Sequence, residues 1–60
     1  MKLYRIKSVH VMDPAFVYYL SRRGMVLTVE DGSLYDKERA DVLLTEVKSD
    51  QYIDTVEEVT

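Results

Sequence analysis

Apolar residues recur at helical spacing in the second half of the chain, and the helix that they predict spans Asp36–Lys48. Asp36 suits the start of this helix, because a carboxylate accepts hydrogen bonds from the free N–H groups of the first turn. Lys48 would place a cation in the last turn, at the negative end of the helix dipole. Polar residues fill one face, so we expect the other face to lie on a sheet. Four residues at offsets of 0, 3, 4 and 7 form the apolar stripe, namely Ala40, Leu43, Leu44 and Val47.

Three apolar runs elsewhere predict strands, at Lys2–Met12, Met25–Glu30 and Tyr52–Val59. They contain the β-branched and aromatic residues that strands favour. In the first run the alternation changes phase near Ser8, which predicts a bulge or a bend there. The middle run alternates most regularly. The last run ends in two glutamates, which indicates a solvated edge strand.

The stretch 15–21 supports two interpretations. Its aromatic and β-branched residues favour a strand. Asp13 as an N-cap, Pro14 at the first helical position and Gly24 after two arginines instead favour a short helix over 14–23. If the stretch is a strand, residues 21–24 form a hairpin loop; if it is a helix, Gly24 is its C-cap.

Asp31-Gly32 predicts a type I′ turn after the run that ends at Glu30, and residues 33–35 are expected to pair back briefly before the helix. Together these elements predict an α+β domain. It consists of a small, mostly antiparallel sheet of three to four strands, with one helix at about 36–48 packed on one face, in ββ(β)αβ order. The alternative architecture adds the short helix at 14–23.

The size of the chain limits how it can be stabilised. It has 60 residues and no cysteine, so we expect a single domain over residues 1–60 without disulfides. A domain this small buries only about 60% of the surface that its unfolded chain exposes, and association is the remedy that we expect. The chain starts without a long apolar run, and no stretch approaches the roughly 20 apolar residues of a membrane span. These features predict a cytoplasmic protein without membrane association.

Charge is divided unevenly along the chain. Residues 1–29 hold five basic residues against one acidic residue, a net charge of +4, whereas residues 30–60 hold three against ten, a net charge of −7. The ordinary interpretation is that the basic and the acidic halves of the chain form two solvated surfaces that pack into one mixed exterior. The alternative is an acidic face that steers a basic partner toward the chain.

No group of residues predicts catalysis. Cysteine nucleophiles and Gly-rich phosphate loops are absent from the sequence, and its four serines have only His10 as a base. We interpret His10 as a strand or surface histidine. The acidic residues between Glu30 and Glu38 do not match the spacing of a calcium loop, and turn and cap roles explain them better. We therefore expect a protein that is not an enzyme and needs no cofactor or metal.

Arg22 and Arg23 follow Tyr18 and Tyr19, a combination that can contact phosphates and stack on bases. A solvated loop beside core aromatics explains the same residues. The acidic balance of the chain argues against nucleic acid as a partner, because affinity for phosphate comes from cationic charge.

Tyrosine is the most frequent aromatic residue, at positions Tyr4, Tyr18, Tyr19, Tyr35 and Tyr52. A sheet covered by one helix has a second face, and tyrosine is enriched at interfaces. Some of these tyrosines are expected on an exposed face that binds a partner. Alternatively, two or three of them simply cover the small core. The adjacent pair must point to opposite sides if residues 15–21 form a strand.

The run Met25–Leu44 resembles segments of small bacteriophage accessory proteins. In such segments a strand, an acidic-Gly turn and an aromatic residue precede an Ala-x-x-Leu-Leu helix, and a final strand closes the domain, so the resemblance covers roughly the last 35 residues. The resemblance implies a protein that binds a host protein and inhibits or redirects it. It is a packing pattern and assigns no functional residue.

We therefore predict a non-enzymatic protein-interaction module that binds a partner protein and modulates or inhibits it, with a phage-encoded inhibitor of a host factor as the specific case. The alternatives are a homo-oligomeric structural subunit, such as a homodimer, and an acidic mimic of DNA that blocks a nucleic-acid-binding protein. The predicted contact residues are Tyr18, Tyr19, Arg22 and Arg23 on one surface and Glu38, Asp41, Glu57 and Glu58 on an acidic one.

Overall fold

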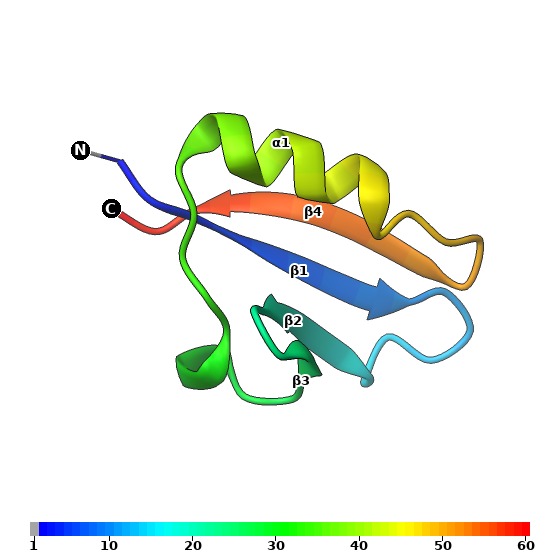
Figure 1. The fold of residues 1–60 in the computed structure, drawn as a ribbon. Helices are drawn as coiled ribbons and strands as arrows, with labels where there is room; N and C mark the ends of the chain where they lie inside the picture. The colour runs from blue at the N-terminus through cyan, green and yellow to red at the C-terminus, as the bar shows by residue number, and fades with distance from the viewer. Residues whose placement is uncertain (1) are drawn as a thin grey trace.

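The computed structural model describes residues 2–60, which form an antiparallel sheet with one α-helix and a short 3-10 helix (Figure 1). The elements are β1 (Tyr4–His10), β2 (Val17–Ser21), β3 (Gly24–Val26), η1 (Val29–Asp31), α1 (Lys37–Glu46) and β4 (Tyr52–Glu58). The strand order is β3-β2-β1-β4, so β4 returns beside β1 after the helix. The predicted α+β architecture and element order are confirmed. The alternative helix over 14–23 is wrong, because residues 17–21 form β2.

The core lies between α1 and the two strands that it contacts, β1 and β4. Ile6 of β1 and Ala40 of α1 are both 0% exposed. The other members of the predicted apolar stripe are half-buried, and the polar face of the helix is exposed. Among residues 2–60, the buried apolar side chains are Ile6, Leu20, Tyr35 and Ala40.

The start of α1 is capped as predicted, whereas its end comes earlier. The Asp36 carboxylate accepts a hydrogen bond of 2.7 Å from the backbone N–H of Arg39. Val47 is the C-cap, and its N–H donates to the Leu43 carbonyl at 3.0 Å. Lys48 therefore lies beyond the helix, and the predicted cation in the last turn is wrong. The chain has already turned toward β4 at this point.

The predicted bulge in the first strand is also wrong. The register between β1 and β4 runs without interruption from Tyr4↔Glu58 to His10↔Tyr52. Ser8 shares the helix side of the sheet with Ile6 and is 1% exposed. Its hydroxyl donates to the Asp54 carboxylate, which meets the cost of burying a polar group. The change of phase in the sequence arises because the polar Ser8 is buried on the helix side, whereas the apolar Val9 lies on the opposite face of the sheet.

The hairpin between β2 and β3 is confirmed. Ser21 pairs with Gly24 across a two-residue loop, and the Ser21 hydroxyl donates to the Gly24 carbonyl at 2.7 Å. Gly24 has a φ of 121°, a conformation that glycine adopts without the steric cost of a side chain.

The predicted strand Met25–Glu30 is wrong beyond Val26, where the chain leaves the sheet and forms η1. The Thr28 hydroxyl donates to the Asp31 carboxylate, and the Asp31 N–H donates to the Thr28 carbonyl at 3.2 Å. This local turn competes with continued strand pairing. The predicted type I′ turn is wrong as well, since Gly32 has φ −67° and ψ 143°.

Residues 33–35 pair back briefly, as predicted. Tyr35 exchanges two backbone hydrogen bonds with Tyr4, each 2.7 Å long. The Ser33 N–H donates to the Leu20 carbonyl at 3.0 Å. These bonds join the segment before α1 to both β1 and β2, and so fix where the helix begins.

Candidate functional site

The predicted tyrosine–arginine surface is divided by the fold. Tyr18 pairs with Ser8 and lies on the helix side, whereas Tyr19 pairs with Lys7 and lies on the other face. The two arginines form the exposed loop between β2 and β3. The Arg22 guanidinium lies 5.4 Å from the centre of the Tyr35 ring. The structure therefore does not bring these four residues into one contact surface.

Two of the predicted acidic contacts lie on the exposed face of α1. Glu38 is in the first turn, where a negative charge suits the helix dipole. Asp41 forms an ion pair of 2.7 Å with Lys37, and this hydrogen bond raises the pKa of the lysine. Both roles are those of an ordinary solvated helix.

The other two acidic residues lie on opposite faces of β4. Glu57 binds Arg5 at 2.9 Å and Lys7 at 3.5 Å on the face opposite the helix. Glu58 accepts a hydrogen bond of 3.4 Å from the Tyr4 hydroxyl on the helix side. A mimic of DNA requires its carboxylates to line one face. The four predicted carboxylates do not have this arrangement.

The outer edge of β4 is open along much of its length. At one end of the β1–β4 ladder, the Val59 N–H donates to the Leu3 carbonyl at 2.7 Å. At the other end, the Val11 N–H donates to the Gln51 carbonyl at 3.0 Å. Bonded and non-bonded pairs alternate in an antiparallel ladder, so every second residue of β4 directs its N–H and C=O away from β1. These outward residues include Asp54, Val56 and Glu58.

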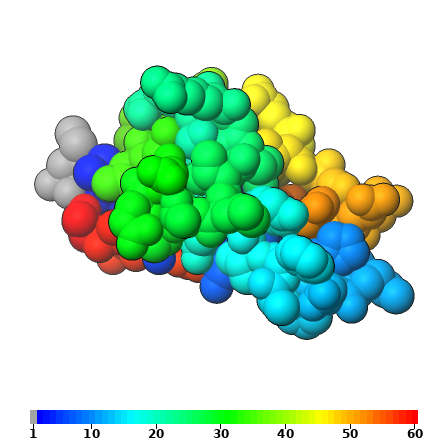
Figure 2. Space-filling model, turned by 90° about the horizontal axis from the view of Figure 1, so that it is seen from below, coloured from blue at the N-terminus to red at the C-terminus, as the bar shows by residue number. Residues whose placement is uncertain are grey.

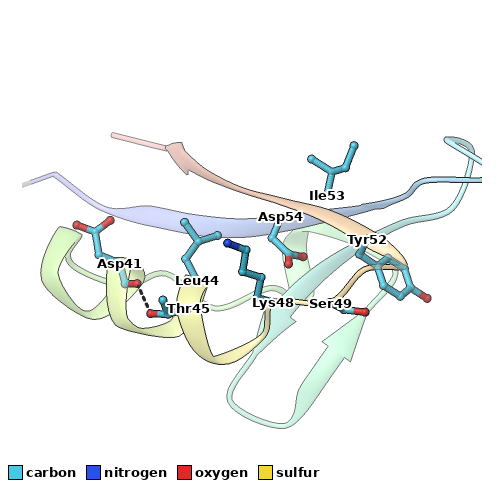
Figure 3. A pocket seen from close by; sticks show the side chains of 8 residues that line it. All are labelled: Asp41, Leu44, Thr45, Lys48, Ser49, Tyr52, Ile53 and Asp54. Atoms are coloured by element: carbon cyan, nitrogen blue, oxygen red, sulfur yellow. Dashed lines mark hydrogen bonds between the residues drawn. The ribbon is translucent and has the colours of Figure 1, made fainter.

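A cleft of about 330 Å³ lies beside this edge, between the C-terminal half of α1 and β4 (Figure 3). Asp54 points to the helix side of β4, whereas Ile53 points to the opposite face. Leu44 and Lys48 project into the cleft from the helix end. The full lining is Asp41, Leu44, Thr45, Lys48, Ser49, Tyr52, Ile53 and Asp54.

The hydrogen bonds around the cleft do not form a catalytic triad. The Ser8 hydroxyl donates directly to the Asp54 carboxylate. His10 lies in β1, and its Nδ1 accepts a bond of 3.2 Å from the Met12 N–H. A nucleophilic serine would instead need the histidine as its base. Residues 2–60 also hold no group of three or more His, Asp or Glu side chains placed to bind a metal ion.

Exposed apolar side chains gather where β1 ends and β4 begins, and we call this group the apolar end. Figure 2 shows the loop 11–16 projecting there beside the segment that leads into β4. Met12 is 84% exposed and Ile53 61%. The group consists of Val11, Met12, Phe16 and Ile53.

Among the residues that line the α1–β4 cleft, Asp41 was predicted as a partner contact and Tyr52 as one of the interface tyrosines, whereas Leu44 and Asp54 were not predicted to act at a site. In the sequence, Asp54 fits an ordinary strand and Leu44 fits the apolar stripe of the helix. Alternation along β4 places Tyr52, Asp54 and Val56 on one face, and this signal was present in the sequence. That this face borders an open edge depends on the strand order.

The part of the chain that the structure describes contains no helix long and apolar enough to cross a bilayer. Comparison with known proteins finds no family model, no curated protein and no solved structure that matches the chain. The resemblance to bacteriophage accessory proteins therefore stays a prediction.

Proposed function

We propose that this chain is a non-enzymatic protein-binding module that captures an extended segment of a partner protein as an additional strand on β4. The observation that carries the proposal is the open β4 edge beside the α1–β4 cleft. Strand addition supplies affinity through main-chain hydrogen bonds, and adjacent pockets supply specificity for alternate side chains. An edge strand next to a helix offers both.

The β4 edge lacks three of the residue types that commonly block strand addition. Its seven residues, YIDTVEE, include no proline, glycine or lysine, and its pairing with β1 is continuous. Such edges are templates for another strand. Three residues of β4 are acidic. Arg5 and Lys7 neutralise Glu57 on the face opposite the helix, whereas Asp54 and Glu58 would deter any added strand that does not carry complementary charge.

Some residues of β4 direct their N–H and C=O groups away from β1. The side chains of these residues determine which partner segment would fit. Asp54 and Glu58 are acidic, and Val56 between them is apolar and half-buried. A strand added here would place alternate residues on the helix side, opposite this acidic–apolar–acidic series. We therefore expect a segment with a basic, an apolar and a basic residue at alternate positions. A module of this kind could inhibit or redirect a host protein, as the resemblance to phage accessory proteins implies.

A test of strand addition uses the acetylated, amidated peptide Lys-Thr-Val-Thr-Lys, whose palindromic sequence suits either strand direction. We expect it to slow hydrogen exchange at the outward amides of β4, measured by NMR. N-methylation of the Val56 amide in the chemically synthesised chain keeps the side chain and removes one outward donor. It should weaken binding at least about tenfold, because it removes a hydrogen bond and obstructs the edge.

N-methylation of Glu38 is the matched control, because this amide lies in the first turn of α1 and makes no bond within the helix. The peptide should bind this control as it binds the unmodified chain. Equal affinity for the Val56 and Glu38 variants, or exchange protection outside β4, would show that the partner does not add to this edge.

A second candidate function, a homo-oligomeric subunit, is favoured by the apolar end. Contiguous exposed apolar side chains commonly mark interaction sites. If copies associate through this group, the melting temperature should rise with protein concentration, because association stabilises the folded chain by mass action. Replacing Met12 and Phe16 with Ser should remove that dependence. A melting temperature independent of concentration would eliminate this candidate.

A further inference from the structure

Asp54, whose charge would face a basic residue of the added strand, also borders a hollow on the helix side of the sheet. Its side chain is half-buried, and residues 2–60 supply no ion-pair partner within 4.0 Å. The carboxylate accepts a hydrogen bond from the Ser8 hydroxyl, and Ser8 itself is 1% exposed. A carboxylate held in place by a buried donor, without a countercharge, is positioned to receive a cation.

Aromatic rings border this carboxylate on the helix side of the sheet. The centres of the Tyr18 and Tyr52 rings are 5.7 Å apart, and the rings are nearly perpendicular, at 81°. The centre of the His10 ring lies 5.1 Å from that of Tyr52, again edge to face. These contacts limit the motion of Tyr52. A hollow of about 280 Å³ lies beside these rings, and it is lined by Ser8, Tyr18, Met25, Tyr52 and Asp54.

We propose that this hollow, the Asp54 pocket, binds the guanidinium group of an arginine side chain on a partner protein. A guanidinium donates two parallel hydrogen bonds to a carboxylate, and it also stacks on aromatic rings. Tyr18 and Tyr52 supply the rings. Met25, which is 44% exposed at the rim, supplies an apolar surface for the methylene groups of the arginine.

The charged groups near the pocket are compatible with this ligand. Asp41 and Lys48 line the neighbouring α1–β4 cleft, which shares Asp54 and Tyr52 with the pocket. Asp41 already binds Lys37. Lys48 is exposed, and it is the basic residue that lines this cleft. It would compete with a bound arginine for Asp54, so its removal should strengthen binding.

The Asp54 pocket faces the helix side of the sheet, whereas strand addition uses the backbone edge of β4. The two proposals can therefore fail separately. A small arginine derivative has too little backbone to act as a strand, and it should bind the N-methyl-Val56 chain as well as the unmodified chain.

The test is an NMR titration of the full chain with Nα-acetyl-arginine amide. We expect the largest shifts at the ring signals of Tyr18 and Tyr52 and at the Met25 methyl group. Asp54→Asn keeps an acceptor for Ser8 and removes the charge, and it should weaken binding at least tenfold. Lys48→Gln should strengthen binding severalfold. Nα-acetyl-lysine amide should bind more weakly than the arginine derivative, because an ammonium group lacks the planar fork.

Asp50→Asn is the matched control, because it removes the same charge from an exposed loop next to β4. Binding to this variant should equal binding to the unmodified chain. An equal loss in the Asp50 and Asp54 variants would mean nonspecific attraction to an acidic protein and would overturn the proposal. Shifts confined to the surface of α1, or no saturable shifts, would also overturn it.

Discussion

Replacing Ile6 with Ala should lower the free energy of unfolding by about 2 to 5 kcal/mol. Ile6 is fully buried in β1, the central strand that pairs with both β2 and β4 and contacts α1. Truncation removes apolar contacts and leaves a cavity that a small domain cannot refill. A domain of this size is stable by only about 3 to 9 kcal/mol, so the loss is a large fraction of its total stability. Urea denaturation followed by circular dichroism measures the change.

Ile53→Ala is the matched control, because it deletes the same atoms from a neighbouring strand. Ile53 is 61% exposed on the face opposite the helix. Its truncation should change stability by no more than about 0.5 kcal/mol. If Ile6→Ala is too unstable to measure, Ile6→Val should still cost about 0.5 to 1.5 kcal/mol. Equal losses at Ile6 and Ile53 would mean that the core is not on the helix side.

Local features of the sequence were sufficient to predict α1. The cap at Asp36 and the stripe that includes Ala40 are both present in the structure. Each depends on residues within a few positions of one another, which is where sequence patterns are most informative. The C-terminal limit was less accurate, because the turn toward β4 depends on the pairing of Ser49 with Tyr52.

The strands show where local information is insufficient. Residues 25–30 alternate well, yet the bonds between Thr28 and Asp31 turn the chain out of the sheet after Val26. Alternation shows which residues could share a face, whereas competition between a ladder and a turn decides whether a strand continues. The stretch 15–21 had the opposite difficulty. Its helix signals at both ends were outweighed by pairing with β1.

The candidate site depends still more on long-range pairing. The two terminal glutamates correctly indicated an edge at β4, but the open backbone groups follow from the β1–β4 register. Ser8 and Asp54 are far apart in the sequence, and only this pairing places the hydroxyl against the carboxylate. The Tyr18–Tyr52 contact likewise joins strands on opposite sides of β1. No periodicity within one segment could have predicted either contact.

Ala40→Leu should lower the free energy of unfolding by about 1 to 3 kcal/mol, although leucine is as good a helix former as most residues. Ala40 is 0% exposed where α1 contacts the sheet, so the larger side chain must either strain or lift the helix. Val42→Leu is the control, since Val42 is 44% exposed on the same helix and a leucine there should be nearly neutral.

Because a displaced helix would also widen the α1–β4 cleft, Ala40→Leu should weaken binding of the Lys-Thr-Val-Thr-Lys peptide, whereas Val42→Leu should not. Unchanged stability and unchanged peptide affinity in Ala40→Leu would mean that α1 does not rest on the sheet at this residue.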